Sequence, residues 1–244
     1  MGQKYVPYDI LFTTTLGGGI VMSKKTIAER LEENPFIKLN DAVYERLREQ
    51  IISLQYEPGA RLVESQLAEE LHVSRSPVKA ALSRLEKENL VTQEPGKSPY
   101  VAPIRYEDCL MLLEVRRGIE GQAAYLAAER ITEEELEALK DALVGIKQAD
   151  RANDPLRCAR SDAGLHRLVA EASRNRYLQE AFAPMQGNIS RYLLYVLQKM
   201  RAQGLHEYEH HLGIYHALKS RSACLARDEM IRSVEHMYQA MRYL

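Results

Sequence analysis

The stretch "RLVESQLAEELHVSRSPVKAALSRLEKENLV", residues 61–91, decides how the first half of this chain folds. Its apolar residues have helical spacing over Ser65–Leu71 and again over residues 74–88, with a short polar turn between them. The second helix opens with a serine, a favourable N-cap residue, and Pro77 falls in its first turn, where the missing N–H costs little. His72 lies at the turn and tolerates a positive φ better than most residues. The stretch therefore predicts two helices joined by a tight turn.

The flanking sequence adds one helix before this pair and a hairpin after it. In "NDAVYERLREQIISLQ", residues 40–55, a capping asparagine precedes apolar residues at helical spacing, and Pro58–Gly59 marks a turn. In "NLVTQEPGKSPYVAPI", residues 89–104, two short extended pieces flank a Pro-Gly turn, which indicates a hairpin with Lys97 at its tip. Three helices followed by a hairpin form a winged helix-turn-helix domain, which we place at residues 38–103.

The start of the second helix of the pair has the residues that a DNA-reading helix needs. In a helix-turn-helix, this helix enters the major groove with its N-terminal end. Arg75 can donate two hydrogen bonds to a guanine edge, which gives about 1–3 kcal/mol of discrimination. Ser74 and Ser76, with the free N–H groups of the first turn, suit phosphate oxygens. Lys79 follows Arg75 by four residues and therefore lies on the same helix face.

A small three-helix unit for protein contacts is the alternative interpretation, because short Ser-Arg helix starts are common. The apolar side of the second helix suits both interpretations and consists of Val78, Ala81, Leu82 and Leu85. Residues 74–84 contain three cations and no acid, and this local cluster matters more for DNA than the formal net charge of −1. The hairpin with Lys97 at its tip favours DNA binding.

The composition is that of a soluble globular protein. The chain has 244 residues, of which 45% are hydrophobic and 27% charged, enough for one large domain or two modest ones. No apolar run approaches the ~20 residues of a membrane-spanning helix, so we expect a cytoplasmic protein without a membrane partner. Cys109, Cys158 and Cys224 are far apart and odd in number, which argues against a disulfide framework.

Residues 1–37 differ from the rest of the chain. The segment "TTTLGGGIVMSKK", residues 13–25, is polar and glycine-rich and has no convincing period. We therefore expect a disordered or flexible N-terminal segment. Three glycines precede Met22, and their codons could be a ribosome-binding sequence, so we consider Met22 as the natural start.

Residues 104–244 are predicted to be entirely helical. A capping box at Thr132–Glu135 opens one of the helices. Six helices of this size form a bundle with its own core and room for a pocket. The predicted helices span residues 106–130, 132–150, 156–171, 177–200, 207–219 and 223–242.

Several histidines and one aspartate in this half have spacings that a metal site could use. Asp162 and His166 are four residues apart and so share one helix face. His210 and His211 follow on a later helix, and His236 lies on the last. A carboxylate and several imidazoles inside a bundle can hold a divalent ion such as Zn²⁺, Ni²⁺ or Mn²⁺. Spacing alone favours the alternative, in which these histidines are surface residues or satisfied core residues.

The N-terminal half resembles the DNA-binding domain of the GntR family of bacterial transcription regulators. The motifs that carry this resemblance lie in "YEPGARLVESQLAEELHVSRSPVKAALSRLEKENLV", residues 56–91. His72 and Asn89 stand where the family usually has glycine, and Lys97–Ser98 stand in the wing where arginine and glycine are more usual. The resemblance implies contacts to double-stranded DNA from Ser65, Ser74, Arg75, Ser76, Lys79 and Lys97.

The C-terminal half resembles the FCD effector domain, which defines the FadR subfamily of GntR regulators. The motifs are "EVRRGIEGQAAYLAAERIT", residues 114–132, "DAGLHRLVAEASRNRYL", residues 162–178, and "EHHLGIYHAL", residues 209–218. The compact VanR type of this domain fits the length. The resemblance therefore implies an effector-binding and dimerisation domain over residues 104–244.

The same resemblance implies a metal site beside a carboxylate effector. Asp162, His166 and His211 fall on three of the four positions that commonly hold the metal. The fourth position falls on Ser233, and His236 comes one turn later. Because helical side chains lean toward the N-terminus of their helix, His236 is the candidate for the fourth ligand.

Arg116 matches a family arginine that could pair bidentately with an effector carboxylate. It could equally bridge Glu120, four residues further along the same helix. Taken together, the resemblance predicts a homodimeric, ligand-responsive repressor that binds a palindromic operator. The alternative is a metal-dependent hydrolase with an accessory winged-helix module, which uses Asp162, His166 and His211 as ligands and an open position for water.

Overall fold

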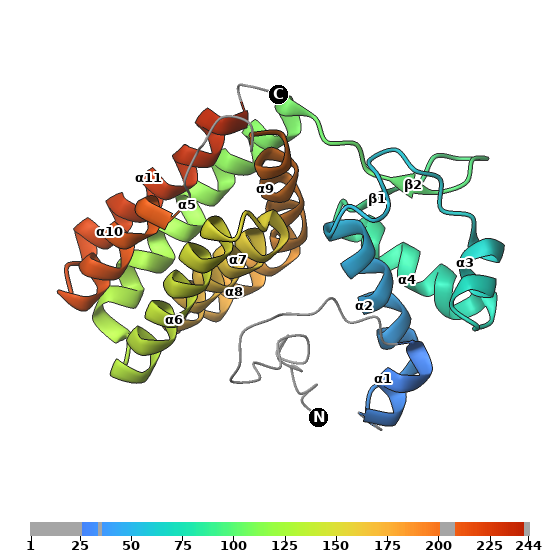
Figure 1. Cartoon of the computed structure of the whole chain (residues 1–244), viewed down its shortest axis with the longest axis horizontal. Helices are drawn as coiled ribbons and strands as arrows, with labels where there is room; N and C mark the ends of the chain where they lie inside the picture. Colours follow the sequence, from blue (N-terminus) through green and yellow to red (C-terminus); the bar gives the residue numbers. More distant parts are fainter. Residues whose placement is uncertain (1–25, 34–35, 201–207, 242–244) are drawn as a thin grey trace.

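The computed structural model describes residues 26–33, 36–200 and 208–241, so Met22 lies outside the described residues. It is almost entirely helical, as the sequence predicts (Figure 1). The elements are α1 (Ile27–Glu33), α2 (Leu39–Ile52), α3 (Glu64–Glu70), α4 (Arg75–Lys87), β1 (Val91–Thr92), β2 (Tyr100–Val101), α5 (Tyr106–Arg130), α6 (Glu133–Arg151), α7 (Pro155–Ala172), α8 (Arg176–Phe182), a 3₁₀ turn (Ala183–Met185), α9 (Gln186–Met200), α10 (Tyr208–Lys219) and α11 (Ala223–Met241).

The N-terminal domain is a three-helix unit, α2 to α4, closed by the antiparallel pair β1–β2. Its core is apolar and includes Leu47 of α2, Leu67 of α3 and Leu85 of α4, all buried. His72, between α3 and α4, has a φ of 53°, and Asn89, after α4, has a φ of 57°. Both residues therefore adopt the left-handed conformation that the tight turns require.

A short helix, α1, lies within the segment that the sequence predicts to be unstructured. Thr26 and Glu29 form a reciprocal cap, in which the Thr26 N–H donates to Glu29 Oε2 at 2.6 Å and the Glu29 N–H donates to Thr26 Oγ1 at 3.2 Å. Ile27 is buried in the N-terminal core. A seven-residue helix needs only one or two buried side chains. It therefore shows no extended apolar period in the sequence, which is why the sequence did not predict it.

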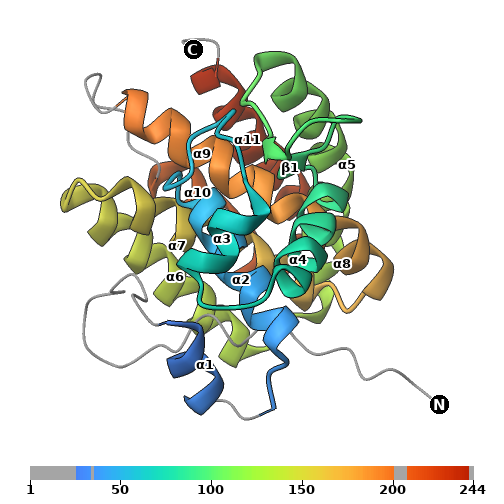
Figure 2. The same cartoon turned by 90° about the vertical axis from the view of Figure 1, so that its right-hand side faces the viewer.

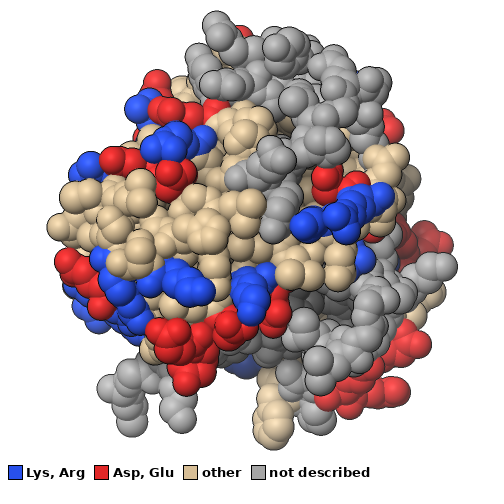
Figure 3. Space-filling view, turned by 60° about the vertical axis from the view of Figure 1, so that its left-hand side comes forward, with Lys and Arg blue, Asp and Glu red and all other residues tan. Residues whose placement is uncertain are grey.

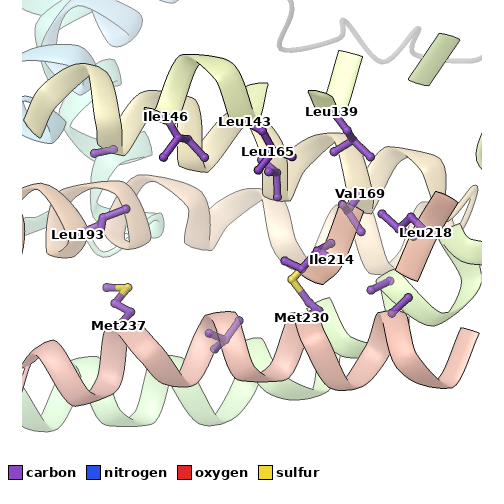
Figure 4. Packing of buried hydrophobic residues seen from close by; sticks show 14 of the residues in the cluster. Leu139, Leu143, Ile146, Leu165, Val169, Leu193, Ile214, Leu218, Met230 and Met237 are labelled. Carbon is purple, nitrogen blue, oxygen red and sulfur yellow. The ribbon is translucent and has the colours of Figure 1, made fainter. Parts of the chain in front are cut away.

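The C-terminal domain is a bundle of α5 to α11 with a main apolar core (Figure 4) and a smaller apolar cluster around Phe182 of α8. Side chains from α5, α6, α7, α9, α10 and α11 meet in the main core, among them Leu143 of α6, Leu165 of α7, Leu193 of α9 and Met230 of α11. The helices α5 and α11 approach closely, because Gly121 of α5 leaves room for Ile231, whose Cγ1 would lie 3.1 Å from an added Cβ. The predicted capping box at Thr132 is present at the start of α6.

The helix predicted over residues 177–200 is two helices. A 3₁₀ turn at Ala183–Met185 separates α8 from α9, and Pro184 lies within it. A proline ring removes one backbone donor and clashes with the preceding turn, so the α-helix cannot continue through it unchanged. The described part of the C-terminal domain therefore has seven α-helices where the sequence predicted six.

The two domains contact each other directly through α9 and α7 (Figure 1). Asn188 of α9 donates to the Glu88 carbonyl at the end of α4, at 2.7 Å, and Arg191 of α9 donates to the Ala102 carbonyl at 2.8 Å. Arg160 of α7 forms an ion pair with Glu49 of α2 at 3.1 Å. These contacts join the bundle to the end of α4 and to the segment after the hairpin.

No helix in the described part of the chain combines the length and the apolar character needed to cross a membrane.

Candidate functional site

The N-terminal end of α4 is exposed and carries unpaired positive charge. Arg75, Ser76 and Lys79 are exposed, while the opposite side of the helix is buried. In the part of the chain that the structure describes, neither the Arg75 nor the Lys79 side chain forms an ion pair or a hydrogen bond. Ser74 is the N-cap residue, but its side chain accepts no hydrogen bond from α4. The hydroxyl and the first-turn N–H groups of α4 are therefore available to a ligand.

This end of α4 lies on an open side of the molecule. Figure 2 shows α3 and α4 in front of the bundle, on the side of the N-terminal domain that faces the viewer. Ser65 is exposed on α3. The third cation of the cluster, Arg84, has a different role, because it lies 2.6 Å from Asp41 and its guanidinium covers the Tyr44 ring. Arg84 therefore connects α4 to α2.

The hairpin presents Lys97 at its tip, as predicted, but this lysine has a partner. Its Nζ lies 2.5 Å from Glu94 Oε2, and the Tyr100 hydroxyl donates to Glu94 Oε1 at 2.7 Å. The Lys97 side chain is 69% exposed, so the ion pair is open to solvent and weak. A phosphate could compete with Glu94 for this lysine.

The C-terminal domain brings Asp162, His166 and His211 together in its interior. All three are buried, and one ligand atom from each lies within 4.8 Å of the others. His211 Nε2 is 2.8 Å from Asp162 Oδ1, and His166 Nε2 is 3.7 Å from the same oxygen. Burial would raise the pKa of Asp162, but the neighbouring His166, His211 and Arg116 lower it to about 2, so the carboxylate is ionised.

These three side chains fit a divalent metal ion. A tetrahedral ion with bonds of about 2.0–2.2 Å separates its ligands by roughly 3.3–3.6 Å. The observed separations of 2.8 and 3.7 Å from Asp162 are close to that range. Two imidazoles and one carboxylate are a donor set that Zn²⁺, Ni²⁺ and Mn²⁺ accept. The structure thus contains a group that can hold such an ion.

His236, predicted as a fourth ligand, is not part of this group. Its ring stacks on His210, with the centroids 3.3 Å apart and the planes 23° from parallel. Burial and the charges of His210 and His211 lower the pKa of His236 to about 4. The position one turn earlier on α11 is Ser233, which is buried. The His236 side chain therefore packs on His210 and does not join Asp162, His166 and His211.

Arg116 pairs with Glu120, which is one of the two alternatives that the sequence left open. Arg116 Nε donates to Glu120 Oε1, its Nη2 donates to Glu120 Oε2 at 3.4 Å, and its Nη1 contacts Met237 Sδ at 3.3 Å. Both Arg116 and Glu120 are almost completely buried. Burial would raise the pKa of Glu120, but Arg116 and His166 lower it to about 2. The pair is therefore a buried, ionised contact next to the candidate metal site.

Glu120 is the site residue that sequence reasoning missed. Its Oε2 lies 2.5 Å from Nδ1 of His166, a residue 46 positions further along the chain. The spacing from Arg116 to Glu120 signalled an ion pair on one helix, but nothing local to either residue indicated the contact with α7. Only the packing of α5 against α7 creates it.

Among the described residues on the face drawn in Figure 3, no large area carries charge of a single sign. Lysine and arginine side chains are interspersed there with aspartate and glutamate around an uncharged band. Interspersed charges of this kind suit solubility rather than attraction of a polyanion. The exposed, unpaired cations at the start of α4 are thus the better candidate for contact with nucleic acid.

Comparison with known proteins agrees with this division of the chain. The family model described as "Bacterial regulatory proteins, gntR family" matches residues 39–101, and the FCD domain model matches residues 111–236. The HTH-type transcriptional regulator LutR of Bacillus subtilis is 31% identical over 203 residues, which are 72% of this chain and 89% of LutR. The HTH-type transcriptional regulator McbR of Escherichia coli is 26% identical over 212 residues, which are 83% of this chain and 94% of McbR.

Solved structures show the same fold. Escherichia coli McbR/YncC matches with a TM-score of 0.71 at 23% identity, covering 86% of this chain and all 100% of that one. A GntR transcriptional regulator from Rhodococcus sp. RHA1 matches with a TM-score of 0.72 at 22% identity, covering 84% and 97%. The family models and relatives are those of regulators, which decides against the metal-dependent hydrolase. The chain belongs to the GntR family of bacterial regulatory proteins: it is a transcriptional regulator, not an enzyme, with a DNA-binding winged helix-turn-helix followed by an FCD effector-binding domain.

Proposed function

We propose that this regulator is a homodimeric repressor of the FadR subfamily that binds a palindromic operator and responds to a small carboxylate in its FCD domain. The observation that carries the proposal is the pairing of two features in one chain. One is the exposed, uncompensated cationic end of α4, and the other is the buried Asp162–His166–His211 group. The contacts of α9 with the end of α4 provide a physical connection between the two.

On the DNA side, we propose that α4 enters the major groove with its N-terminal end. Arg75 would read a guanine edge, and Lys79, on the same face, would contact a base or a phosphate. The remaining contacts would be phosphate contacts, which fix the position of the domain without reading sequence. We assign these to Ser65, Ser74, Ser76 and Lys97.

The experiment compares Arg75→Ala with Arg151→Ala in a gel-shift assay at one fixed salt concentration. Duplexes selected from a random pool supply the operator. Arg151 is an exposed arginine at the end of α6, so its removal changes the total charge by the same amount outside the winged helix-turn-helix domain. Losing a bidentate guanine contact of about 1–3 kcal/mol should weaken specific binding by roughly 5- to 150-fold. Arg151→Ala should leave it nearly unchanged, and equal losses for the two variants would contradict the assignment.

On the effector side, we propose that Asp162, His166 and His211 hold Zn²⁺, Ni²⁺ or Mn²⁺. Three protein ligands leave at least one coordination position for a carboxylate oxygen of the effector. Arg116 adds positive charge nearby, although its bidentate edge contacts Glu120. Elemental analysis of the purified protein and of His166→Ala tests the ion, and mass spectrometry of released small molecules tests the effector. A metal content unaffected by His166→Ala would exclude this set of ligands.

For the homodimer, we propose that one face of α5 contacts a second copy of the chain. Met111 and Val115, one turn apart, are 58% and 48% exposed, which is unusual for large apolar side chains on one helix face. Gly118, one turn further, has open space where a side chain would begin. A palindromic operator requires two α4 helices related by two-fold symmetry, so the partner we propose is an identical chain.

For the response, we propose that the effector changes the spacing of the two DNA-binding domains. We propose that this change rearranges the contacts of Asn188 and Arg191 with the N-terminal domain, because these bonds join α9 to backbone carbonyls of that domain. A useful response needs only about 10²-fold difference in affinity, near 2.7 kcal/mol. That amount is comparable to the loss of two or three hydrogen bonds.

A further inference from the structure

The contact between Glu120 and His166 determines which ring nitrogen of His166 carries the hydrogen and which faces Asp162. Its imidazole lies between two carboxylates: Nδ1 is 2.5 Å from Glu120 Oε2, and Nε2 is 3.7 Å from Asp162 Oδ1. The exposure of the His166 and Glu120 side chains is 3% and 1%, so water does not replace either partner. A neutral imidazole has one N–H and one lone pair, and the hydrogen bond at one nitrogen decides which nitrogen carries the hydrogen.

Glu120 can only accept a hydrogen bond, because the buried guanidinium of Arg116 donates to both of its carboxylate oxygens and needs a charged partner. Arg116 holds this carboxylate in place from the other side through Nε and Nη2, and Arg116 is itself fully enclosed. The short distance to Nδ1 therefore requires the hydrogen of His166 to lie on Nδ1. The lone pair of His166 then lies on Nε2, which faces Asp162 and is the atom that a metal ion would need.

We propose that Glu120 is a positioning residue, which fixes His166 in the tautomer with its hydrogen on Nδ1 and so makes Nε2 a metal ligand. This inference rests on the proposed metal site for its function, but the tautomer itself does not depend on a bound metal. Arg116 contributes indirectly, by fixing the carboxylate of Glu120. Carboxylate–histidine–metal arrangements of this kind raise the basicity of the histidine and set its orientation.

The same geometry predicts what the isosteric variant Glu120→Gln does. A guanidinium has only donors, so the amide oxygen of the glutamine must face Arg116. The NH₂ group then faces Nδ1 of His166, which can no longer carry a hydrogen. The hydrogen moves to Nε2, and the lone pair turns away from Asp162 and His211. Glu120→Gln therefore reverses the tautomer of His166 without changing the shape of the site.

The decisive measurement is the tautomer of His166 in the metal-free full-length protein, from its ring ¹⁵N chemical shifts by NMR at pH 8. The ring ¹⁵N signals of His166 are assigned as those that disappear from the spectrum of the His166→Gln variant. Wild type should carry the hydrogen on Nδ1, and Glu120→Gln should carry it on Nε2. A wild-type hydrogen on Nε2, or both nitrogens protonated at pH 8, overturns the proposal. Since the wild-type result alone decides this, the test holds even if Glu120→Gln does not fold.

The second measurement is the affinity for Zn²⁺ and Ni²⁺ by competition with a chromophoric chelator. Glu120→Gln should weaken binding about 10- to 100-fold, the usual effect of losing such a partner. The control is Glu114→Gln, which removes an equal charge from an exposed position of the same helix and should leave the affinity nearly unchanged. An equal affinity for wild type and a folded Glu120→Gln overturns the proposal. If wild type binds neither ion, the proposed metal site fails, while the NMR result still decides the role of Glu120.

Discussion

His72 and Asn89 show how single residues set the turns of the N-terminal domain. Each has a positive φ, 53° and 57°, at a position just after a helix, where related domains usually have glycine. A side chain in this conformation carries a steric cost of about 1–2 kcal/mol, somewhat less for histidine and asparagine than for most residues. The turns on both sides of α4 therefore form at a small cost in stability.

We predict that His72→Gly raises the free energy of unfolding of this domain by about 0.5–1 kcal/mol. Glycine removes the steric cost, and the greater freedom of the unfolded chain offsets part of the gain. Because His72 is exposed, no packing is lost. His72→Val should lower the free energy of unfolding, because a β-branched residue is strongly disfavoured at positive φ. Urea denaturation followed by circular dichroism measures both, and a lower midpoint for His72→Gly would contradict this account.

The helix starts show that similar residues serve different purposes in different elements. Thr132 begins α6 with a complete capping box, in which its hydroxyl accepts from the Glu135 N–H at 3.3 Å and Glu135 Oε2 accepts from the Thr132 N–H at 3.0 Å. Ser74 begins α4 in an equivalent position, but its side chain makes no such bond. Thr132 therefore satisfies a backbone N–H group of its own helix, whereas Ser74 leaves the N–H groups at the start of α4 available to a ligand.

Thr132→Ala and Ser74→Ala should therefore have opposite profiles. Thr132→Ala should lower the free energy of unfolding by about 1 kcal/mol, because a capping bond is lost, and should leave DNA affinity unchanged. Ser74→Ala should have little effect on stability but should weaken DNA binding, because we assign its hydroxyl to a phosphate. Thermal denaturation and gel shifts on the same two proteins provide the measurements. Loss of stability in Ser74→Ala without loss of affinity would show that Ser74 is a structural cap.

At the scale of the whole molecule, the two domains contact each other but keep separate hydrophobic cores. Each has its own apolar core, and the contacts between them are both polar, as at Asn188 and Arg191, and apolar, because Leu54 of the N-terminal domain packs against the C-terminal core. Gly187 of α9 permits the close approach, because an added Cβ would lie 3.0 Å from Leu90 Cδ1 of the N-terminal domain. An interface of this kind holds one arrangement and can change to another without unfolding either core.

The proposed dimer can be tested by placing a charge on the exposed face of α5. Val115→Arg should convert the dimer to a monomer in analytical ultracentrifugation, because a charge at the centre of an apolar contact must be desolvated without a partner. The matched control is Val144→Arg on α6, where the valine is 45% exposed, close to the 48% of Val115. Val144→Arg should remain dimeric. A dimer that persists in Val115→Arg would place the contact between copies on another surface.

The sequence by itself determined most of the elements of this protein, apart from α1 and the break between α8 and α9, and the residues at the start of α4. Helical period, capping residues and turn residues act over a few neighbouring positions, so the helix-turn-helix, the hairpin and the helical C-terminal half could all be predicted. The ion pair between Arg116 and Glu120 was one of two predicted alternatives, because the two residues are four positions apart and lie on one helix face. The break between α8 and α9 was missed, although Pro184 signalled it locally.

Only the tertiary structure decided which side chains meet inside the bundle. It brought Asp162 and His166 of α7 to His211 of α10, stacked His236 on His210, and placed Glu120 of α5 against His166. These contacts join residues that are far apart in the chain, and they depend on how each helix is rotated against its neighbours. That rotation is set by the packing of the whole apolar core, which no short stretch of sequence contains.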